Sequence, residues 1–286
     1  MSQTLVGSRY DLHVAAKGKT ESKAAHDYFA VHPGDLEHGK GEGDDLLGYV
    51  HSYEVGSTVD GPGLRFVGFL TGCLLRCQYC HNPDTWHLYN GHPVTVARAM
   101  EVITKYAHVL KMSRGGITLS GGEPQLQRAF TTAIFRRCKQ LGLHTCIDTS
   151  GRLGDRFSDE ELADVDLTLL DIKSGDPDIY EKVTRQPLQP TLDFAHRLSA
   201  LRRPMWVRFV LVPGLTDGHD NVAKVADICA GLRSLERVEI LRFHQMGSDK
   251  WHKLHLTYAL ENTEPPDADL TERVREQFRN RGLTVY

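Results

Sequence analysis

The sequence lacks any apolar run near the roughly 20 residues that a membrane-spanning helix needs. Charged side chains interrupt its first 30 residues, where a secretory signal would be continuously apolar. It also lacks an excess of charge of either sign, because 34 basic residues stand against 37 acidic ones without long runs of either. These absences predict a cytoplasmic protein that binds neither membrane nor nucleic acid.

Cysteine is scarce as well, with six in 286 residues. Disulfides are not expected in the reducing cytoplasm, yet three of the six crowd into one short segment as Cys73, Cys77 and Cys80. Such crowding is typical of a metal site. The other cysteines stand alone in apolar segments and are predicted to be small buried side chains; they are Cys138, Cys146 and Cys229.

Residues 1–47 show no sustained apolar period and are rich in Gly, Lys, Asp, Glu and His. Such a segment cannot bury enough surface to offset the entropy of ordering it. We therefore expect residues 1–47 to form a disordered tail. Residues 48–286 are expected to form one core domain, since the chain is 40% apolar and long enough for a large core.

From residue 48 onward, short β-branched or apolar runs alternate with longer segments of helical period. Parallel strands need crossovers, which helices supply, so the alternation predicts an α/β fold with a parallel sheet. The predicted strands are residues 64–71, 116–120, 144–148, 167–172, 205–212 and 237–243. The predicted helices are residues 96–110, 125–141, 158–163, 191–201, 221–232 and 267–279.

The strand–helix repeats fit either an open doubly wound sheet or a partial barrel. Polar and glycine-rich residues follow the end of nearly every predicted strand, among them Gly121, Asp148, Asp171 and His244. In barrel folds the active site is built from the loops at the carboxyl ends of the strands. This distribution favours a partial TIM-like (β/α)6 barrel.

The cysteine segment has the spacing C-x3-C-x2-C, which leaves two interpretations open. Zinc would need a fourth protein ligand, for which His81 or His87 is available. A 4Fe-4S cluster normally takes four cysteines. With only three, one iron lacks a protein ligand and is open to a substrate.

The spacing, with Tyr79 before the last cysteine and His81 and Asn82 after it, resembles the signature of the radical S-adenosylmethionine (SAM) superfamily. In more detail, residues 48–286 resemble the pyruvate formate-lyase activating enzymes, and residues 1–47 lie outside the resemblance. The segments that carry it are residues 58–66, 72–86, 120–123, 144–151, 170–173, 210–214 and 243–247, together with Trp251.

The resemblance implies a partial barrel of the radical SAM type that binds one 4Fe-4S cluster and SAM. It places the cluster on Cys73, Cys77 and Cys80. The residues that it assigns to SAM binding are Tyr79, Cys80, His81, Gly121, Gly122, Glu123, Asp171, Ile172, Lys173, Arg208 and His244.

A monovalent cation and a substrate contact are implied in the same way. By resemblance, Asp148, Thr149 and Asp171 bind the cation near SAM, and Asp60 contacts the glycine loop of the substrate. A helix cap or a strand-end turn is the alternative interpretation of Asp148.

Physical chemistry supports several of these assignments. Without a side chain at Gly122, the backbone can approach the SAM amino group to hydrogen-bond distance. Asp171 and Lys173 alternate on a strand, so their side chains share one face. Arg208 alternates with apolar neighbours and needs an anionic partner if it faces the barrel interior. The alternatives are a tight turn at Gly121–Gly122, an exposed ion pair at Asp171–Lys173 and a structural role for His244.

The resemblance also implies the activity. The reduced cluster donates one electron to the SAM sulfonium, giving methionine and a 5'-deoxyadenosyl radical that takes a hydrogen from the α-carbon of one glycine in pyruvate formate-lyase. The chain is thus expected to be a monomeric oxidoreductase whose partners are pyruvate formate-lyase and, as electron donor, flavodoxin or ferredoxin.

Two other functions stay open. One is activation of another glycyl radical enzyme. Many such activases carry an inserted ferredoxin-like domain, whereas residues 82–94 here form a short connection without cysteine. The other, from a different class, is a non-catalytic iron-sulfur or zinc module.

Overall fold

The computed structural model describes residues 41–286, in which eight strands form one sheet in the order β3-β1-β2-β4-β5-β6-β7-β8. Strands β2 and β4 to β8 are parallel to one another, while β1 pairs antiparallel with both β2 and β3. The strands are β1 Leu47–Ser57, β2 Arg65–Leu70, β3 His92–Thr95, β4 Gly116–Gly121, β5 His144–Thr149, β6 Leu167–Asp171, β7 Met205–Leu211 and β8 Leu235–Arg242.

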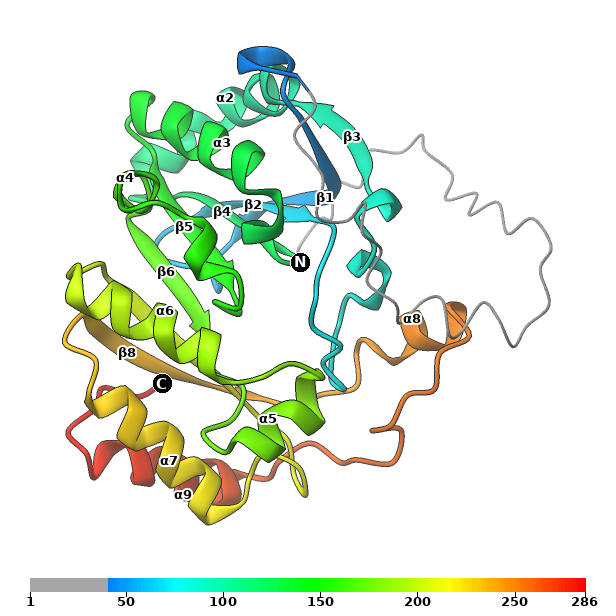
Figure 1. Ribbon diagram of the computed structural model, residues 1–286, viewed down its shortest axis with the longest axis vertical. Helices are drawn as coiled ribbons and strands as arrows, with labels where there is room; N and C mark the ends of the chain where they lie inside the picture. Colours follow the sequence, from blue (N-terminus) through cyan, green and yellow to red (C-terminus); the bar gives the residue numbers. More distant parts are fainter. Residues whose placement is uncertain (1–40) are drawn as a thin grey trace.

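Helices connect the parallel strands and lie along the outer side of the curved sheet, as α3, α6 and α7 show (Figure 1). The helices are α2 Val96–Met112, α3 Arg128–Gln140, α4 Asp159–Ala163, α5 Pro177–Thr184, α6 Gln189–Ala200, α7 His219–Ala230, α8 Ser248–Lys253 and α9 Ala268–Arg279. The six parallel strands are those predicted from the sequence, and the partial (β/α)6 barrel is confirmed.

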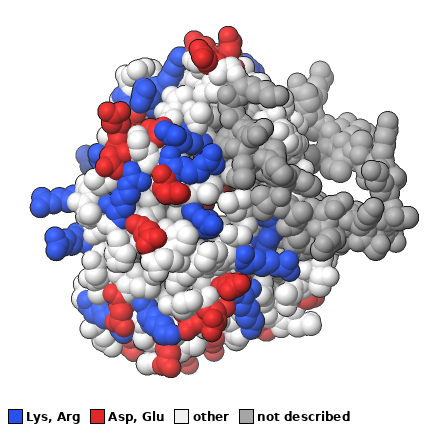
Figure 2. All heavy atoms as spheres, in the orientation of Figure 1, with Lys and Arg blue, Asp and Glu red and all other residues white. Residues whose placement is uncertain are grey.

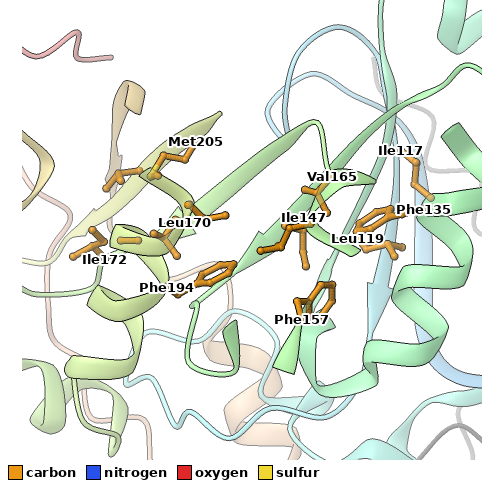
Figure 3. Packing of buried hydrophobic residues seen from close by; sticks show 14 of the residues in the cluster. Ile117, Leu119, Phe135, Ile147, Phe157, Val165, Leu170, Ile172, Phe194 and Met205 are labelled. Carbon is orange, nitrogen blue, oxygen red and sulfur yellow. The ribbon is translucent and has the colours of Figure 1, made fainter. Parts of the chain in front are cut away.

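The main hydrophobic core fills the space between the sheet and these outer helices. Figure 3 shows Phe135 of α3 and Phe194 of α6 directed toward strand residues such as Ile147 and Leu170. All four of these side chains are at most 2% exposed. The apolar faces that the sequence pattern assigned to the helices therefore meet the sheet, as expected for βα repeats.

Capping explains where individual helices begin. The Ser158 side chain accepts from the backbone of Glu161, and the Glu161 side chain accepts from the backbone of Ser158, forming a capping box at α4. Asp176 caps α5 by accepting from the backbone N–H groups of Asp178 and Ile179. These contacts satisfy backbone donors that the first turn of a helix leaves without partners.

The last residues of the chain lie against the outer edge of β8. Val238 donates its backbone N–H to Thr284 at 2.8 Å, and Ile240 donates to Tyr286 at 3.0 Å. Tyr286 in turn donates to the carbonyl of Val238 at 2.9 Å. The run at residues 283–286 is thus a short parallel addition to β8, with a bridge between Val238 and Val285.

The predicted tail divides into two parts. Residues 1–40 lie outside the described residues. Residues 41–47 contain a 3-10 turn at Gly43–Asp45, and Leu46 belongs to the main core. Since Leu46 also accepts a backbone hydrogen bond from Val96 at 3.0 Å, packed structure reaches further toward the N-terminus than residue 48.

The sequence patterns missed β1, β3, α5 and α8. Strand β1 contains His51, Ser52 and Glu54 within a burial pattern that is not a clean alternation. Register shifts interrupt its pairing with β2, which blurs the period of two. The short helices α5 and α8, of 8 and 6 residues, offer too few positions for a helical period to stand out.

Charged side chains of both signs are interspersed on the molecular face shown in Figure 2. Within residues 41–286, none of the helices combines the length and the apolar character that crossing a bilayer requires.

Candidate functional site

The cysteine loop begins directly after β2. Gly72 donates its backbone N–H to Thr85 at 2.7 Å, and Cys73 donates to Trp86 at 2.9 Å, so the loop closes back on the residues that follow it. Within it, Cys80 donates to the carbonyl of Cys77 at 3.0 Å. The loop places Cys73, Cys77 and Cys80 on one short and closed segment at the carboxyl end of β2.

Helix α5 supports the loop from the other side. Arg76 donates its backbone N–H to Thr184 at 2.8 Å, and Gln78 donates to Val183 at 3.0 Å. The loop also packs into a second apolar cluster that contains Cys77, Tyr79, Trp86 and Trp251, among others. The loop geometry is therefore set by backbone hydrogen bonds and by packing together.

The three cysteines are free thiols with apolar surroundings. Burial raises the pKa of Cys77 to about 12 and also raises the pKa values of Cys73 and Cys80. Metal binding to such thiols has to displace their protons.

Lys173 links the end of β6 to the cysteine loop. Its Nζ lies 2.8 Å from Oδ2 of Asp171 and 5.6 Å from the ring centre of Tyr79. Burial would lower the pKa of Lys173, but the charges of Asp171 and Cys77 raise it well above its usual value. A permanent cation, 8% exposed, therefore lies near two of the residues predicted for the site.

The turn Gly121–Gly122 packs directly on this loop. A Cβ on Gly122 would lie 2.5 Å from the carbonyl oxygen of Gly72, and Gly121 has a φ of +101°. Glu123 donates its backbone N–H to that same carbonyl at 2.7 Å. Glycine is needed here because the turn packs on the backbone of the cysteine loop.

The Glu123 carboxylate is fully enclosed. It accepts hydrogen bonds from the Thr149 hydroxyl at 2.6 Å and from the Ser150 hydroxyl and backbone at 2.5 and 3.0 Å. Burial raises the pKa of Glu123, and the hydrogen bonds of Ser150 and Thr149 oppose that rise. These contacts connect the end of β5 to the glycine turn and use the hydroxyl of Thr149, which the sequence assigned to a cation.

Arg208 lies in the barrel interior and has the anionic partners that the sequence required. Its Nε lies 3.1 Å from Glu239, and its Nη1 lies 3.5 Å from Asp148 and 3.7 Å from Asp60. Burial would lower the pKa of Arg208, but Asp148 and Glu239 raise it above its usual value. These four charged side chains come from three strands and one loop and form the interior charge network: Arg208, Glu239, Asp148 and Asp60.

Asp148 has the most unusual acidity in this network. Burial raises its pKa to about 6, and the carboxylates of Asp171 and Asp60 add to the rise. Arg208 and a hydrogen bond from the Ser120 hydroxyl, at 2.6 Å, act in the opposite direction. Asp148 therefore joins the interior charge network and does not cap a helix.

The loop between β1 and β2 is fixed from several sides. The Asp60 carboxylate accepts from the Ser57 hydroxyl at 2.5 Å, and its backbone carbonyl accepts from the Thr118 hydroxyl at 2.6 Å. Arg208 donates to the carbonyl of Val59 at 2.5 Å, while the Val59 side chain is 72% exposed. The loop thus joins the surface to the interior charge network.

His81 and His244 come together although they are 163 positions apart by number, with ring centres 4.3 Å apart. Burial lowers the pKa of His81, and His244 adds to this effect. Ile172, in contrast, is fully buried in the main core, so its side chain faces away from the other predicted residues (Figure 3).

Sequence reasoning missed several residues that shape the site. Glu239 and Ser120 are partners of Arg208 and Asp148, respectively. Glu239 alternates with Val238 and Ile240 on β8, which is the signal that could have placed it inside. Ser120 stands directly before Gly121 at the end of β4.

The donor set suits a 4Fe-4S cluster. Three thiols share one closed loop, and the cation of Lys173 lies beside them to offset the negative charge of a thiolate-bound cluster. The buried hydroxyl of Tyr79 has no hydrogen-bond partner among the described residues, which leaves a donor for a bound group. No three His, Cys, Asp or Glu side chains of residues 41–286 converge to hold one metal ion.

The chain is similar to known proteins. The family model of the radical SAM superfamily matches residues 67–226. The pyruvate formate-lyase-activating enzyme of Staphylococcus epidermidis is 46% identical over 241 residues, covering 82% of this chain and 95% of that protein. The pyruvate formate-lyase 1-activating enzyme of Escherichia coli strain K12 is 40% identical over 242 residues, covering 84% of this chain and 98% of that protein.

The fold is also found among solved structures. QueE from Escherichia coli superposes with a TM-score of 0.53 at 12% identity, over 84% of this chain and 92% of the QueE chain. At that identity the likeness concerns the fold alone.

Proposed function

Because this chain belongs to the radical SAM superfamily, and within it to the pyruvate formate-lyase-activating enzymes, we propose that it generates a glycyl radical on pyruvate formate-lyase. Its cofactors are a 4Fe-4S cluster and SAM. When bound, they supply the reductive cleavage of SAM that yields methionine and a radical able to take a hydrogen from a glycine α-carbon.

Similarity over nearly the full length of the relatives carries this proposal. The two alignments span 95% and 98% of the relatives and 82% and 84% of this chain. The structure adds a loop at the mouth of the barrel that presents three free cysteines beside a buried lysine.

The cluster is assigned to Cys73, Cys77 and Cys80. For SAM, the geometry supports Lys173 as the cation that binds its carboxylate, because a buried ammonium makes short and strong hydrogen bonds to such a group. The neighbouring pair of His81 and His244 offers ring faces and edges for an aromatic base.

The other predicted SAM contacts stay part of the proposal, and they also have positioning roles. Gly121 and Gly122 pack the turn on the cysteine loop, and Glu123 ties that turn to β5, so these residues orient the loop. Ile172 contributes only backbone to the region of the site. Arg208 orders the interior carboxylates and the loop of Asp60.

The interior carboxylates support a cation site. The carboxylate of Asp171 adds to the rise in the pKa of Asp148. Four carboxylates meet three cations in this region, through the pairs of Arg208 with Asp60, Asp148 and Glu239, of Arg237 with Glu239 and of Lys173 with Asp171, and this excess favours a positively charged ligand. The hydroxyl of Thr149 already donates to Glu123, so Thr149 would join a cation site only through its remaining lone pairs. Asp60 is proposed to contact the substrate glycine loop through the same surface loop that exposes Val59.

Several finer assignments are part of the proposal. Flavodoxin or ferredoxin is proposed as the one-electron donor, since the cluster must be reduced before SAM is cleaved. We also propose a monomer and a cytoplasmic location, where the reducing environment keeps thiols available for iron.

The test is anaerobic incubation of the reduced enzyme and SAM with pyruvate formate-lyase, followed by electron paramagnetic resonance. A glycyl radical doublet and a gain of lyase activity are expected with the intact protein. Neither is expected with a partner whose radical-site glycine is changed to alanine. SAM cleavage without a radical on pyruvate formate-lyase, but with one on another glycyl radical enzyme, would assign the chain to that other substrate.

A further inference from the structure

Asn221, near the start of α7, is hydrogen-bonded to the loop that follows β6. Its side-chain oxygen Oδ1 accepts from the Ser174 hydroxyl at 2.6 Å. The same oxygen accepts from the backbone N–H groups of Gly175 and Asp176 at 3.0 and 3.2 Å. Asn221 is 3% exposed, and its three donors come directly after Lys173. A buried amide therefore binds the loop that carries this lysine.

The nitrogen of the same amide binds the loop that follows β7. Nδ2 of Asn221 donates to the backbone carbonyl of Thr216 at 2.8 Å. The Thr216 hydroxyl donates to the carbonyl of Val210 at 2.8 Å and accepts from the backbone of Val212 at 2.8 Å. One side chain thus joins the loops at the carboxyl ends of two neighbouring strands, and its oxygen and nitrogen both have partners.

The loop after β6 also packs closely on α7. A Cβ on Gly175 would lie 2.5 Å from the backbone nitrogen of Val225 and 2.6 Å from the Cβ of Lys224. Asp176 pairs with the ammonium of Lys224 at 2.5 Å. Glycine is needed at this contact because the loop and the helix approach each other too closely for a side chain.

Lys173 lies between two fixed points of the backbone. Before it, Ile172 donates its backbone N–H to the carbonyl of Arg208 at 3.1 Å, at the end of the pairing between β6 and β7. After it come the residues that Asn221 holds. The Lys173 side chain is buried between these points, with Nζ 2.8 Å from the Asp171 carboxylate.

We propose that Asn221 is a positioning residue that holds the loop after β6, so that the ammonium of Lys173 stays buried beside the cysteine loop to bind the carboxylate of SAM. The inference rests on the proposed function, in which Lys173 binds SAM. Asn221 acts through Lys173 and has no chemical role of its own.

The physical reason is the cost of leaving buried donors without an acceptor. If the Asn221 oxygen is removed, the N–H groups of Gly175 and Asp176 lose their acceptor, and a buried donor without one is costly. The loop would move toward water to satisfy them. Lysine has a long and flexible side chain, so a shift of its backbone releases the ammonium from its buried position.

The experiment compares three variants with wild type as holoenzymes purified without oxygen. Asn221→Leu has a similar shape and no polar atom, whereas Asn221→Asp keeps the acceptor oxygen and loses the donor to Thr216. The matched control is Gln277→Met, because Gln277 is a buried amide of α9 that donates to His219 at the same end of α7, at 3.0 Å. Melting temperature, iron content, the dissociation constant of SAM and the rate of Lys173 acetylation by an activated ester are measured for each.

For Asn221→Leu we expect about tenfold weaker SAM binding, because a hydrogen bond to a charged group is no longer aligned. The acetylation of Lys173, followed by mass spectrometry, should become faster as the amine becomes exposed. Asn221→Asp and Gln277→Met should lower the melting temperature and keep the wild-type values of both other quantities. Unchanged SAM binding or unchanged acetylation in a folded Asn221→Leu enzyme, or equal changes in either of the other variants, would overturn the proposal.

A second measurement needs no variant. Gly175 and Asp176 belong to neither a helix nor a strand, yet their N–H groups are bound to Asn221 and should exchange slowly with deuterated water. The control is the exposed N–H of Gly214, which binds Asp217 at 2.8 Å and should exchange fast. Equally fast exchange at all three would overturn the proposal even if Asn221→Leu failed to fold. Pyruvate formate-lyase takes part in none of these measurements, so their outcome is separate from the formation of a glycyl radical.

Discussion

In the barrel interior the guanidinium of Arg208 faces three carboxylates, and the pKa of Asp148 depends on its contacts with the other charged groups. Asp148, Asp60 and Glu239 all lie within 3.7 Å of Arg208. Arg208 is shared among the three, and Glu239 also pairs with Arg237 at 2.5 Å. At Asp148, burial outweighs the attraction of Arg208, and its pKa rises to about 6. This carboxyl group titrates within the range in which most enzymes work.

This acidity predicts a specific dependence of stability on pH. An acid whose folded-state pKa lies above its unfolded value stabilises the protein fully below the unfolded pKa and loses that contribution as pH rises through the folded pKa. Between pH 5 and 7, we expect wild-type enzyme to lose about 1 kcal/mol that Asp148→Asn does not lose. Anaerobic urea denaturation at several pH values measures it.

The control for this series is Asp155→Asn, since Asp155 is exposed on the surface. That variant should follow the wild-type pH dependence. An identical pH dependence in Asp148→Asn and wild type would show that Asp148 titrates normally.

For single residues, the sequence predicted which residues lie in the site better than it predicted what each of their side chains contacts. The cysteines could be identified because their spacing along the chain is visible in the sequence itself. Arg208 could be identified because a charged side chain among apolar neighbours requires an oppositely charged partner. The enclosure of Glu123 by Thr149 and Ser150 could not be predicted, since it depends on how the loops after β4 and β5 approach each other. The same holds for Trp86 and Trp251, which are 165 positions apart by number and whose rings meet edge to face in the second apolar cluster.

Among the elements, the turn after β4 controls how closely two loops approach. Gly122 donates its backbone N–H to Leu70 at 2.8 Å, and Glu123 donates to Gly72 at 2.7 Å. The turn is therefore hydrogen-bonded to the start of the cysteine loop along its whole length. A side chain at this contact would separate the two.

We expect Gly122→Ala to destabilise the protein by about 1–3 kcal/mol, because the new Cβ would overlap the carbonyl of Gly72. Cluster content should fall with it, since the displaced backbone leads into Cys73. Thermal melts and iron analysis check both expectations. Gly218→Ala is the matched control, because a Cβ there meets no atom within 4 Å; equal effects of the two substitutions would contradict this account.

How well a strand or helix could be predicted from the sequence depended on how deeply it is buried. Strands β2, β4, β6 and β7 are buried along nearly their whole length and appear as largely apolar runs, which makes them easy to find in the sequence. Strands β1 and β3 lie at one end of the sheet and include exposed polar residues, which removes that signal. Helix α8 is defined by the contacts of Lys250 and Trp251 and not by an apolar period.

For the molecule as a whole, the start of the packed domain can be tested by truncation. Removing residues 1–40 is expected to leave the melting temperature unchanged, since that segment is polar and aperiodic. Removing residues 1–47 should lower it, because Leu46 is buried and Asp44 pairs with Arg137. Scanning calorimetry of the two truncated proteins and the full chain distinguishes these outcomes, and equal melting temperatures would place the boundary after Leu46.

The last residues of the chain have a consequence for the molecule in a crowded solution. An open sheet presents unpaired N–H and C=O groups at its outermost strands, which are templates for the strands of other molecules. Residues 284–286 occupy part of this position on β8, and Arg237 lies over the ring of Tyr286 with its guanidinium carbon 4.8 Å from the centre. Residues 284–286 thus cover part of the outer edge of β8. This reduces the number of backbone groups with which the strands of other molecules could pair and aggregate.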